Sequence, residues 1–347
     1  MKPTSANGLR LNRREILLLS ASAGIGAALT RRGHALDRTE TAAYPEPGNS
    51  ATPRYAGGTN METHLKAPAT LTTGAANYLE TKDGAKIYYE DHGEGRPILF
   101  VHGWLCSSRF WQKNVPVLAQ TFRVVTIDLR GHGNSAKALG GLTIRQYARD
   151  VREVVERLGL EDALLVGWSL GGPVVLSYYQ QYAADSCLKA LGLVDTSPFP
   201  FSPEEWNCHA LRNFNFDGMN ATFARLTADH RQFAADFTAR MFKQPPSEAD
   251  AAWIVGEMMK TPTWIAEAIY SDFLMSDLAS TLPAVQVPLI AMAADSRVLP
   301  TGIAMGKALA GLAPRGAFIP FEDAGHMLFY EQPQKFNAAL ASFIQAL

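Results

Sequence analysis

Three side chains in this sequence are of the types that nucleophilic catalysis by a serine needs. Ser169 stands in the pattern Gly-x-Ser-x-Gly, with Gly167 and Gly171 two residues to either side, and Asp295 and His326 follow later. A serine hydroxyl is a weak nucleophile near neutral pH, so it needs a base to take its proton and an acid to orient the base. From their residue types, we expect Ser169 as nucleophile, His326 as base and Asp295 as acid.

The surroundings of Ser169 predict a sharp turn from a buried strand into a helix. An apolar run at 163–166 precedes the turn, and an apolar stretch of helical length follows it. Gly167 and Gly171 suit this turn because a side chain at either position would collide with the neighbouring strand or helix. The backbone N–H of Leu170 would then face the same space as the Ser169 hydroxyl, as a donor to an oxyanion.

The acid has more than one candidate. Asp295 directly follows the strand expected over 287–293, and we expect it to orient the base. Asp195 follows the strand before that one and remains an alternative. Asp323 lies too close to His326 along the chain to orient it easily. For the acids that are not used, turn and cap roles are the ordinary alternative, because Asp suits both.

Strands and helices alternate over 77–196 and again over 284–347, which predicts one α/β domain around a mostly parallel, eight-stranded sheet. A hairpin around Asp83 and Gly84 opens this domain. Ser169, Asp295 and His326 would each follow a strand, so they can meet at one edge of the sheet.

The segment 197–283 differs from the rest of the domain because aromatic and Met residues dominate it at helical spacing. We expect helices inserted after the sixth strand, and the family resemblance described below implies that they form a lid. The aromatic residues indicate that the site beneath them is apolar. Most of these aromatics would pack the lid onto the core. Phe199, Phe201 and Trp206 come just after the strand and are the candidates for lining the substrate pocket.

Several stretches together resemble the α/β-hydrolase family, from about residue 78 to 347. They are His102-Gly103-Trp104, the run 128–135, and the surroundings of Ser169, Asp295 and His326. The chain is most similar to small bacterial esterases of the aryl-esterase and cofactor-free haloperoxidase group. This resemblance implies that the backbone N–H of Trp104 is the second oxyanion donor, beside Leu170, and that His102 and the 128–135 turn are structural.

The resemblance implies a serine hydrolase that cleaves a carboxylic ester through an acyl-enzyme intermediate. Alternatives that use the same site are a cofactor-free perhydrolase or haloperoxidase, and a hydrolase of lactones, amides or carbon–carbon bonds. Perhydrolase-like members tend to place Pro where this chain has Leu105, which argues mildly against the first of these. A non-catalytic ligand-binding protein on the same fold is the alternative from another class.

The N-terminus looks like an export signal. Arg13 and Arg14 precede an apolar run over 16–29, which resembles a twin-arginine signal with cleavage after residue 35. A retained anchor or an N-terminal helix of the domain are the alternatives. We expect 36–76 to be a disordered linker, because it is rich in Pro, Gly, Thr and Ala without an apolar period. The mature protein would be periplasmic or secreted.

Charge and composition say little about the substrate. The 347 residues have a formal net charge of −1, and six basic residues against one acidic residue lie in 1–35, so removal of the leader leaves 26 basic and 32 acidic residues and a charge of −6. This balance gives no sign of nucleic-acid binding. We expect no cofactor and no metal, an apolar ester as substrate and membrane contact only through the export signal. Cys106, Cys187 and Cys208 lack metal spacing, and two of them could pair in an exported protein.

Overall fold

The computed structural model describes residues 77–183 and 187–347. The predicted leader, 1–35, and the predicted linker, 36–76, lie outside these residues.

An eight-stranded sheet forms the centre of the described domain, as the sequence predicts. Its strands are β1 (Asn77–Glu80), β2 (Lys86–His92), β3 (Pro97–Val101), β4 (Arg123–Ile127), β5 (Ala163–Trp168), β6 (Leu188–Val194), β7 (Leu289–Ala293) and β8 (Gly316–Pro320). Their order in the sheet is β1-β2-β4-β3-β5-β6-β7-β8. β2 is antiparallel to β1 and β4, and the pairs from β4 to β8 are parallel. Every residue of β3 and β5 is buried, as expected where both faces of a sheet are covered.

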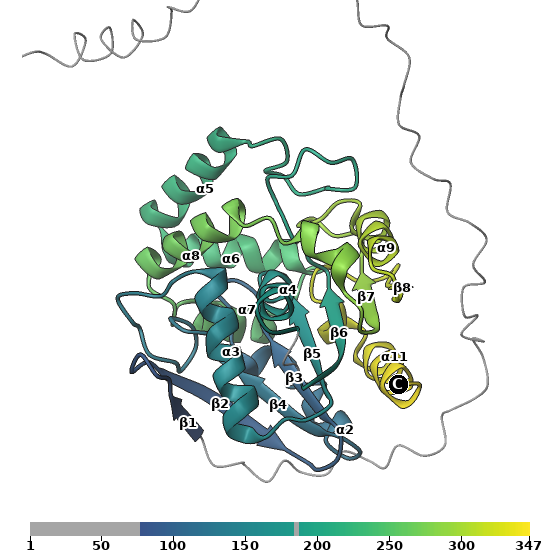
Figure 1. Cartoon of the computed structure of the whole chain (residues 1–347). Helices are drawn as coiled ribbons and strands as arrows, with labels where there is room; N and C mark the ends of the chain where they lie inside the picture. Colours follow the sequence, from purple (N-terminus) through teal and green to yellow (C-terminus); the bar gives the residue numbers. More distant parts are fainter. Residues whose placement is uncertain (1–76, 184–186) are drawn as a thin grey trace, which may run out of the picture. The chain divides into compact units, whose positions relative to one another are not determined.

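Helices cover the sheet and follow most of its strands. The core helices are α3 (Ile144–Leu158), α4 (Gly171–Tyr182), α9 (Gly302–Leu312), the short α10 (Leu328–Glu331) and α11 (Pro333–Gln345). Figure 1 shows α3 and α4 side by side in front of the sheet. The sequence predicts a helix from Thr143 to Leu158 that is capped by Thr143 and stopped at Gly159. Both ends are confirmed in α3, because the Thr143 side chain accepts the Gln146 N–H and Gly159 takes a left-handed φ of 59°.

One predicted helix is wrong in extent. The sequence predicts a single helix over 108–119, whereas the structure has a 3₁₀ turn, η1 (Ser108–Trp111), and a four-residue helix, α2 (Val115–Leu118). The buried Asn114 separates them, and its amide donates to Phe329 O and Asn337 Oδ1 on the C-terminal segment. The two short elements are therefore fixed by tertiary contacts that no local pattern reveals.

The insertion between β6 and β7 is helical, with α5 (Phe216–Ala228), α6 (His230–Met241), α7 (Glu248–Met258), α8 (Thr263–Met275) and the 3₁₀ turn η3 (Ala279–Ala284). Figure 1 shows α5, α6 and α8 grouped together beyond one end of the strands. We call these elements the helical insertion.

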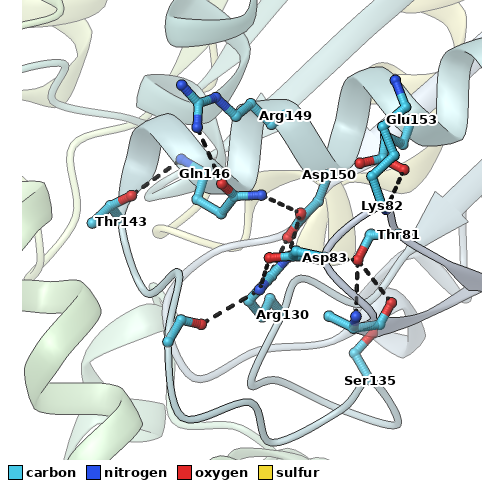
Figure 2. Close-up of polar contacts among 12 residues, drawn as sticks. Thr81, Lys82, Asp83, Arg130, Ser135, Thr143, Gln146, Arg149, Asp150 and Glu153 are labelled. Atoms are coloured by element: carbon cyan, nitrogen blue, oxygen red, sulfur yellow. Dashed lines mark hydrogen bonds and ion pairs between the residues drawn. The ribbon is translucent and has the colours of Figure 1, made fainter.

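The turn after β4 ties the first hairpin to α3 through a buried arginine (Figure 2). Arg130 is 2% exposed and makes paired hydrogen bonds of 2.7 to 2.9 Å to Asp83, in the β1–β2 turn, and to Asp150, on α3. Planar guanidinium matches two carboxylates in this way better than a lysine could. The expectation that the 128–135 turn is structural is consistent with this network.

Candidate active site

Ser169 stands on a strained turn between β5 and α4. Its φ is 53°, in the left-handed region that a residue with a Cβ rarely adopts. A Cβ on Gly167 would lie 2.2 Å from Gly171 O, and a Cβ on Gly171 would lie 2.3 Å from Val101 O. The Thr196 hydroxyl donates to Ser169 O at 2.6 Å and helps to hold the turn. The glycines are therefore required by close backbone packing, as the sequence predicts.

The turn leaves the Ser169 side chain accessible while its neighbours are fully buried. Ser169 is partly exposed, whereas Trp168 and Leu170 are 0% exposed. Because α4 begins at Gly171, the hydroxyl lies at the N-terminal end of a helix, where the backbone favours negative charge.

The acid beside the histidine is Asp195, and not Asp295. His326 Nδ1 lies 2.6 Å from Asp195 Oδ2, and both side chains are buried. Asp195 follows β6 directly and has a φ of 38°, and its other oxygen, Oδ1, accepts the Ala294 N–H from the end of β7 at 3.0 Å. The expectation for Asp295 is therefore corrected, and the alternative in the sequence is the residue that the structure brings to His326.

Asp295 has another contact. It is exposed, and its Oδ1 accepts the Ile303 N–H at 3.0 Å, in the first turn of α9. Such a bond satisfies one of the backbone donors that every helix start leaves free. Asp323 is also exposed and makes no described contact with His326.

Burial sets the electrostatics of the Asp195–His326 pair. Burial away from water raises the pKa of the Asp195 carboxyl. The hydrogen bond from His326 and the charge of that ring lower the same pKa. The Nδ1 contact with a carboxylate places the ring proton on Nδ1, so Nε2 is left without a proton and can accept one.

His326 is held next to the serine turn by its backbone. The Trp168 indole N–H donates to His326 O at 2.9 Å, and the two rings lie 5.3 Å apart between centroids. Ser169 and His326 line the same cavity, although no hydrogen bond between their side chains is present among the described residues. Such contacts are often long in the absence of a substrate and shorten when one binds.

His102 orients the loop after β3. Its Nε2 accepts the Leu129 N–H at 2.9 Å, so Nδ1 carries the ring proton and donates to Gly103 O at 2.7 Å. In a trans peptide the C=O and the following N–H point in opposite directions. Because the Gly103 C=O faces the His102 ring, the Trp104 N–H points away from that ring. A Cβ on Gly103 would lie 3.0 Å from the Ser169 Cβ, which places this peptide beside the serine.

The backbone N–H groups of Trp104 and Leu170 have no hydrogen-bond acceptor within 77–183 and 187–347. A buried N–H without an acceptor is costly, so two such groups near one hydroxyl suit a ligand oxygen. The expectation that Leu170 and Trp104 donate to an oxyanion concerns these same two N–H groups.

The Trp104 side chain joins this loop to the helical insertion. Its indole N–H donates to Ala266 O at 2.9 Å, and its ring stacks on Tyr270 at a centroid distance of 4.3 Å. Phe233 and Phe237 meet the same ring edge-on, at 5.7 and 5.9 Å. α6 and α8 therefore cover the place where the loop after β3 meets the serine.

A cavity of about 60 Å³ lies between the insertion and the sheet. Its polar lining residues are Ser169, Asp195, Ser197, His209 and His326. The rest of its wall consists of Trp104, Phe237, Tyr270, Phe273, Val298 and Leu299. The serine, the histidine and the acid therefore open into one small chamber with aromatic walls.

The predicted pocket residues Phe199, Phe201 and Trp206 do not line this cavity. Phe199 and Phe201 pack instead on Phe214, at centroid distances of 6.1 and 5.7 Å. Trp206 is partly buried against the core. The segment after Ser197 folds back on itself, so nearness to β6 in sequence does not bring these rings to the site.

His209, Tyr270 and Phe273 line the cavity but are not among the pocket residues predicted from the sequence. Tyr270 and Phe273 lie three positions apart on α8, and this spacing would have placed them on one face of a helix. His209 lies in an irregular loop and carries no sequence signal for the site.

The described residues also bear on the cysteines, on metal-binding clusters and on membrane-spanning helices. Cys106, Cys187 and Cys208 are all free thiols. No cluster of three or more His, Cys, Asp or Glu in the described part of the chain could hold a metal ion. In the same residues, no helix is both long and apolar enough to cross a membrane.

Comparison with known proteins is consistent with this geometry. The profile of the alpha/beta hydrolase family matches residues 98–339. A bifunctional esterase/perhydrolase of Acinetobacter calcoaceticus is 32% identical over 78% of this chain and 99% of its own, and a non-heme haloperoxidase of Rhodococcus erythropolis is 30% identical over 78% and 99%.

Solved structures agree on the fold. A bromoperoxidase from Bacillus anthracis superposes with a TM-score of 0.72 at 24% identity, covering 78% of this chain and 100% of its own. A putative aryl esterase from Burkholderia cenocepacia has a TM-score of 0.66 at 26% identity, covering 78% and 98%. The sheet, its order and the match over most of the domain show that the chain belongs to the α/β hydrolase family.

Proposed function

We propose that this protein is a serine hydrolase that cleaves carboxylic esters through an acyl-enzyme intermediate. The observation that carries the proposal is the shared cavity of Ser169 and His326, with Asp195 paired to the far nitrogen of the histidine. This is the arrangement that a hydroxyl needs in order to attack a carbonyl near neutral pH. The esterases among the relatives support the ester as substrate.

In the first half of the reaction, the Ser169 oxygen attacks the acyl carbon while His326 Nε2 takes its proton. Asp195 keeps the imidazolium oriented and stabilises its charge. The negative charge on the carbonyl oxygen is held by the N–H groups of Trp104 and Leu170, which have no other described acceptor. His326 then gives the proton to the departing alcohol.

In the second half, a water molecule replaces the alcohol. His326 takes a proton from the water, which attacks the acyl carbon attached to Ser169. The same two backbone N–H groups stabilise the second oxyanion, and collapse of this intermediate returns the proton to Ser169 and releases the acid. The residues thus perform both halves with one base and one oxyanion site.

The cavity favours a short acyl group. Its volume of about 60 Å³ has room for about four to six water-sized groups. Phe237, Phe273 and Leu299 form part of its wall. Esters of acetate to butyrate fit these dimensions, whereas a long acyl chain needs displacement of α6 or α8. We therefore propose that the helical insertion acts as the lid of this site.

Hydrogen peroxide in place of water is the second candidate reaction, because one relative is named a bifunctional esterase/perhydrolase. Leu105 argues against it. Its φ of 62° is one that Pro cannot adopt, so the loop here has a different backbone from one with Pro at this place. Water is therefore the preferred acceptor.

We also propose export through the twin-arginine sequence at Arg13 and Arg14. Replacing both by Lys in the full chain and following the protein in periplasmic and cytoplasmic fractions tests this. Unchanged secretion of the variant would exclude a twin-arginine route.

The main test is hydrolysis of 4-nitrophenyl esters from acetate to palmitate by the full chain, beside Ser169→Ala. We expect activity that is highest for short acyl groups and absent from the variant, and labelling of Ser169 by a fluorophosphonate. Folded wild-type protein that neither hydrolyses any ester nor takes the label would exclude the proposed function.

A further inference from the structure

The cavity contains three polar side chains that the proposed reaction does not use, Ser197, His209 and Tyr270. The Ser197 hydroxyl already donates to Asn207 Oδ1, which leaves His209 and Tyr270. Neither contacts Ser169 or the Asp195–His326 pair through a described hydrogen bond. Their chemistry therefore bears on what the cavity binds.

The ring of His209 is fixed by the backbone around it. Its Nδ1 accepts the Leu211 N–H at 3.2 Å, and its own backbone N–H donates to Asn207 Oδ1 at 3.1 Å. Because Nδ1 is an acceptor, the neutral ring carries its proton on Nε2. His209 therefore has a free N–H on the side of the ring away from the loop.

Asn207 makes the loop that holds His209 rigid. It is 1% exposed, and its amide donates to Pro200 O and Ser202 O, both at 2.9 Å. Its side-chain oxygen also accepts the Ser197 hydroxyl at 3.3 Å. A side chain supported in this way loses little entropy when it binds a ligand.

His209 remains neutral over the pH range of ester hydrolysis. Burial and the nearby His326 ring lower the pKa of His209 to about 4. A neutral imidazole with this pKa is a weak base but a good hydrogen-bond donor. No hydrogen-bond partner for its Nε2 occurs among the described residues. The side chain is half-buried and lines the cavity.

Tyr270 offers a second donor. Its ring stacks on Trp104 at 4.3 Å, which fixes its plane in the cavity wall. Burial raises the pKa of its hydroxyl, so the hydroxyl stays protonated. This hydroxyl, too, lacks a hydrogen-bond partner in the described part of the chain.

We propose that His209 and Tyr270 form a polar subsite that donates hydrogen bonds to an oxygen of the substrate outside the scissile ester group. The inference rests on the proposed function and names its substrate class: a short ester with an ether, hydroxyl, carbonyl or carboxylate oxygen near the cleaved bond. A purely hydrocarbon group would desolvate both donors without replacing their hydrogen bonds to water, which is unfavourable. The expected apolar substrate is thereby replaced by one of mixed polarity.

Two pairs of esters of equal shape test the subsite on the full chain. On the acyl side, 4-nitrophenyl methoxyacetate is compared with 4-nitrophenyl butyrate, in which CH₂ replaces the ether oxygen. On the alcohol side, 2-methoxyethyl acetate is compared with butyl acetate. Each kcat/KM is divided by the rate constant for alkaline hydrolysis of the same ester, because the ether oxygen changes the intrinsic reactivity.

Variants with matched chemistry identify the donors. His209→Asn keeps an acceptor near Nδ1 for the Leu211 N–H and loses the Nε2 donor, whereas His209→Gln keeps a donor near Nε2. Tyr270→Phe removes the hydroxyl and keeps the stacking on Trp104. The corrected ratio of oxygen-bearing to hydrocarbon ester should fall about 3- to 12-fold in His209→Asn and in Tyr270→Phe, and His209→Gln should restore most of it.

If the corrected ratio falls in the acyl series, the bound oxygen belongs to the acyl part of the substrate. If it falls in the alcohol series, the oxygen belongs to the alcohol part. A ratio that stays within about twofold of wild type in either loss variant, in both series, overturns the proposal. The wild-type protein gives a readout that needs no folded variant: a corrected rate that favours the hydrocarbon ester in both series also overturns it. If the proposed function itself fails, no ester is cleaved in a Ser169-dependent way, so the two failures are distinct.

Discussion

His326 Nδ1 lies 2.6 Å from Asp195 Oδ2, although 131 positions separate the two residues in the chain. The contact forms because β6 and β8 both end at the same edge of the sheet, with β7 between them. Asp195 is fixed on both sides, since its second oxygen accepts the Ala294 N–H from the end of β7. An acid that is held at two points can orient the histidine without moving.

This contact predicts opposite results for the two candidate acids. In Asp195→Asn the imidazole loses its anionic partner and its preferred tautomer, so kcat should fall about 10³- to 10⁴-fold. In Asp295→Ala kcat should stay within about threefold, while loss of the bond to the Ile303 N–H lowers the free energy of unfolding by about 0.5 to 2 kcal/mol. Ester kinetics and urea unfolding of both variants check this, and a large loss of kcat in Asp295→Ala would contradict it.

The fold was largely predictable because its strands are short apolar runs between clear helix signals. The serine turn was predictable for a related reason, since Gly167 and Gly171 record close backbone contacts directly in the sequence. The acid was not, because Asp195 and Asp295 are the same residue type and both follow a strand. What distinguishes them is tertiary: Asp195 is buried, has a left-handed backbone and contacts His326 and Ala294, whereas Asp295 is exposed.

The pocket was also beyond local patterns. Phe201 is fully buried against Phe214 and Phe216, whereas Phe237 and Phe273 reach the cavity from α6 and α8. All of these are Phe residues in one aromatic-rich segment, so composition cannot separate them. How the insertion folds over the sheet decides which rings line the site.

The glycines of the serine turn should not tolerate even a methyl group. In Gly167→Ala the new Cβ would lie 2.2 Å from Gly171 O, a backbone atom that cannot move without displacing Ser169. We expect a loss of about 3 kcal/mol or more in the free energy of unfolding and loss of fluorophosphonate labelling.

Gly256 is the matched control for that substitution. It lies inside α7, and nothing lies within 4 Å of a Cβ built there. Gly256→Ala should therefore raise the free energy of unfolding by about 0.5 to 1 kcal/mol, because Ala loses less backbone entropy in a helix. Urea midpoints of the two variants should shift in opposite directions, and a common direction would show that the contacts do not decide the outcome.

The Arg130 network in Figure 2 should be a main source of stability away from the site. Arg130→Met leaves Asp150, 1% exposed, as a buried carboxylate without its cation, which should cost about 3 to 5 kcal/mol. Arg225→Ala breaks an exposed pair with Asp236 and should cost at most about 1 kcal/mol. Urea unfolding of both variants tests this, and equal losses would mean that burial of the pair has no influence.

Acid should destabilise the fold through histidines that are buried without charge. Burial lowers the pKa of His132 from 6.5 to about 4, and His102 shifts in the same direction for the same reason. Below pH 6.5 the unfolded chain therefore binds a proton that folded His132 does not bind. The His132 contribution to the free energy of unfolding should therefore fall as the pH decreases from 6.5 to 4, by about 2 kcal/mol at pH 5.

His132→Asn isolates this contribution. The ring Nδ1 lies 3.0 Å from Arg130 O, and the Asn amide can donate to the same carbonyl without titrating. We expect the difference in unfolding free energy between pH 7.5 and pH 5 to be about 2 kcal/mol smaller in the variant than in wild type, measured by urea unfolding at both pH values. An equal difference in the two proteins would mean that folded His132 takes up its proton as readily as the unfolded chain does.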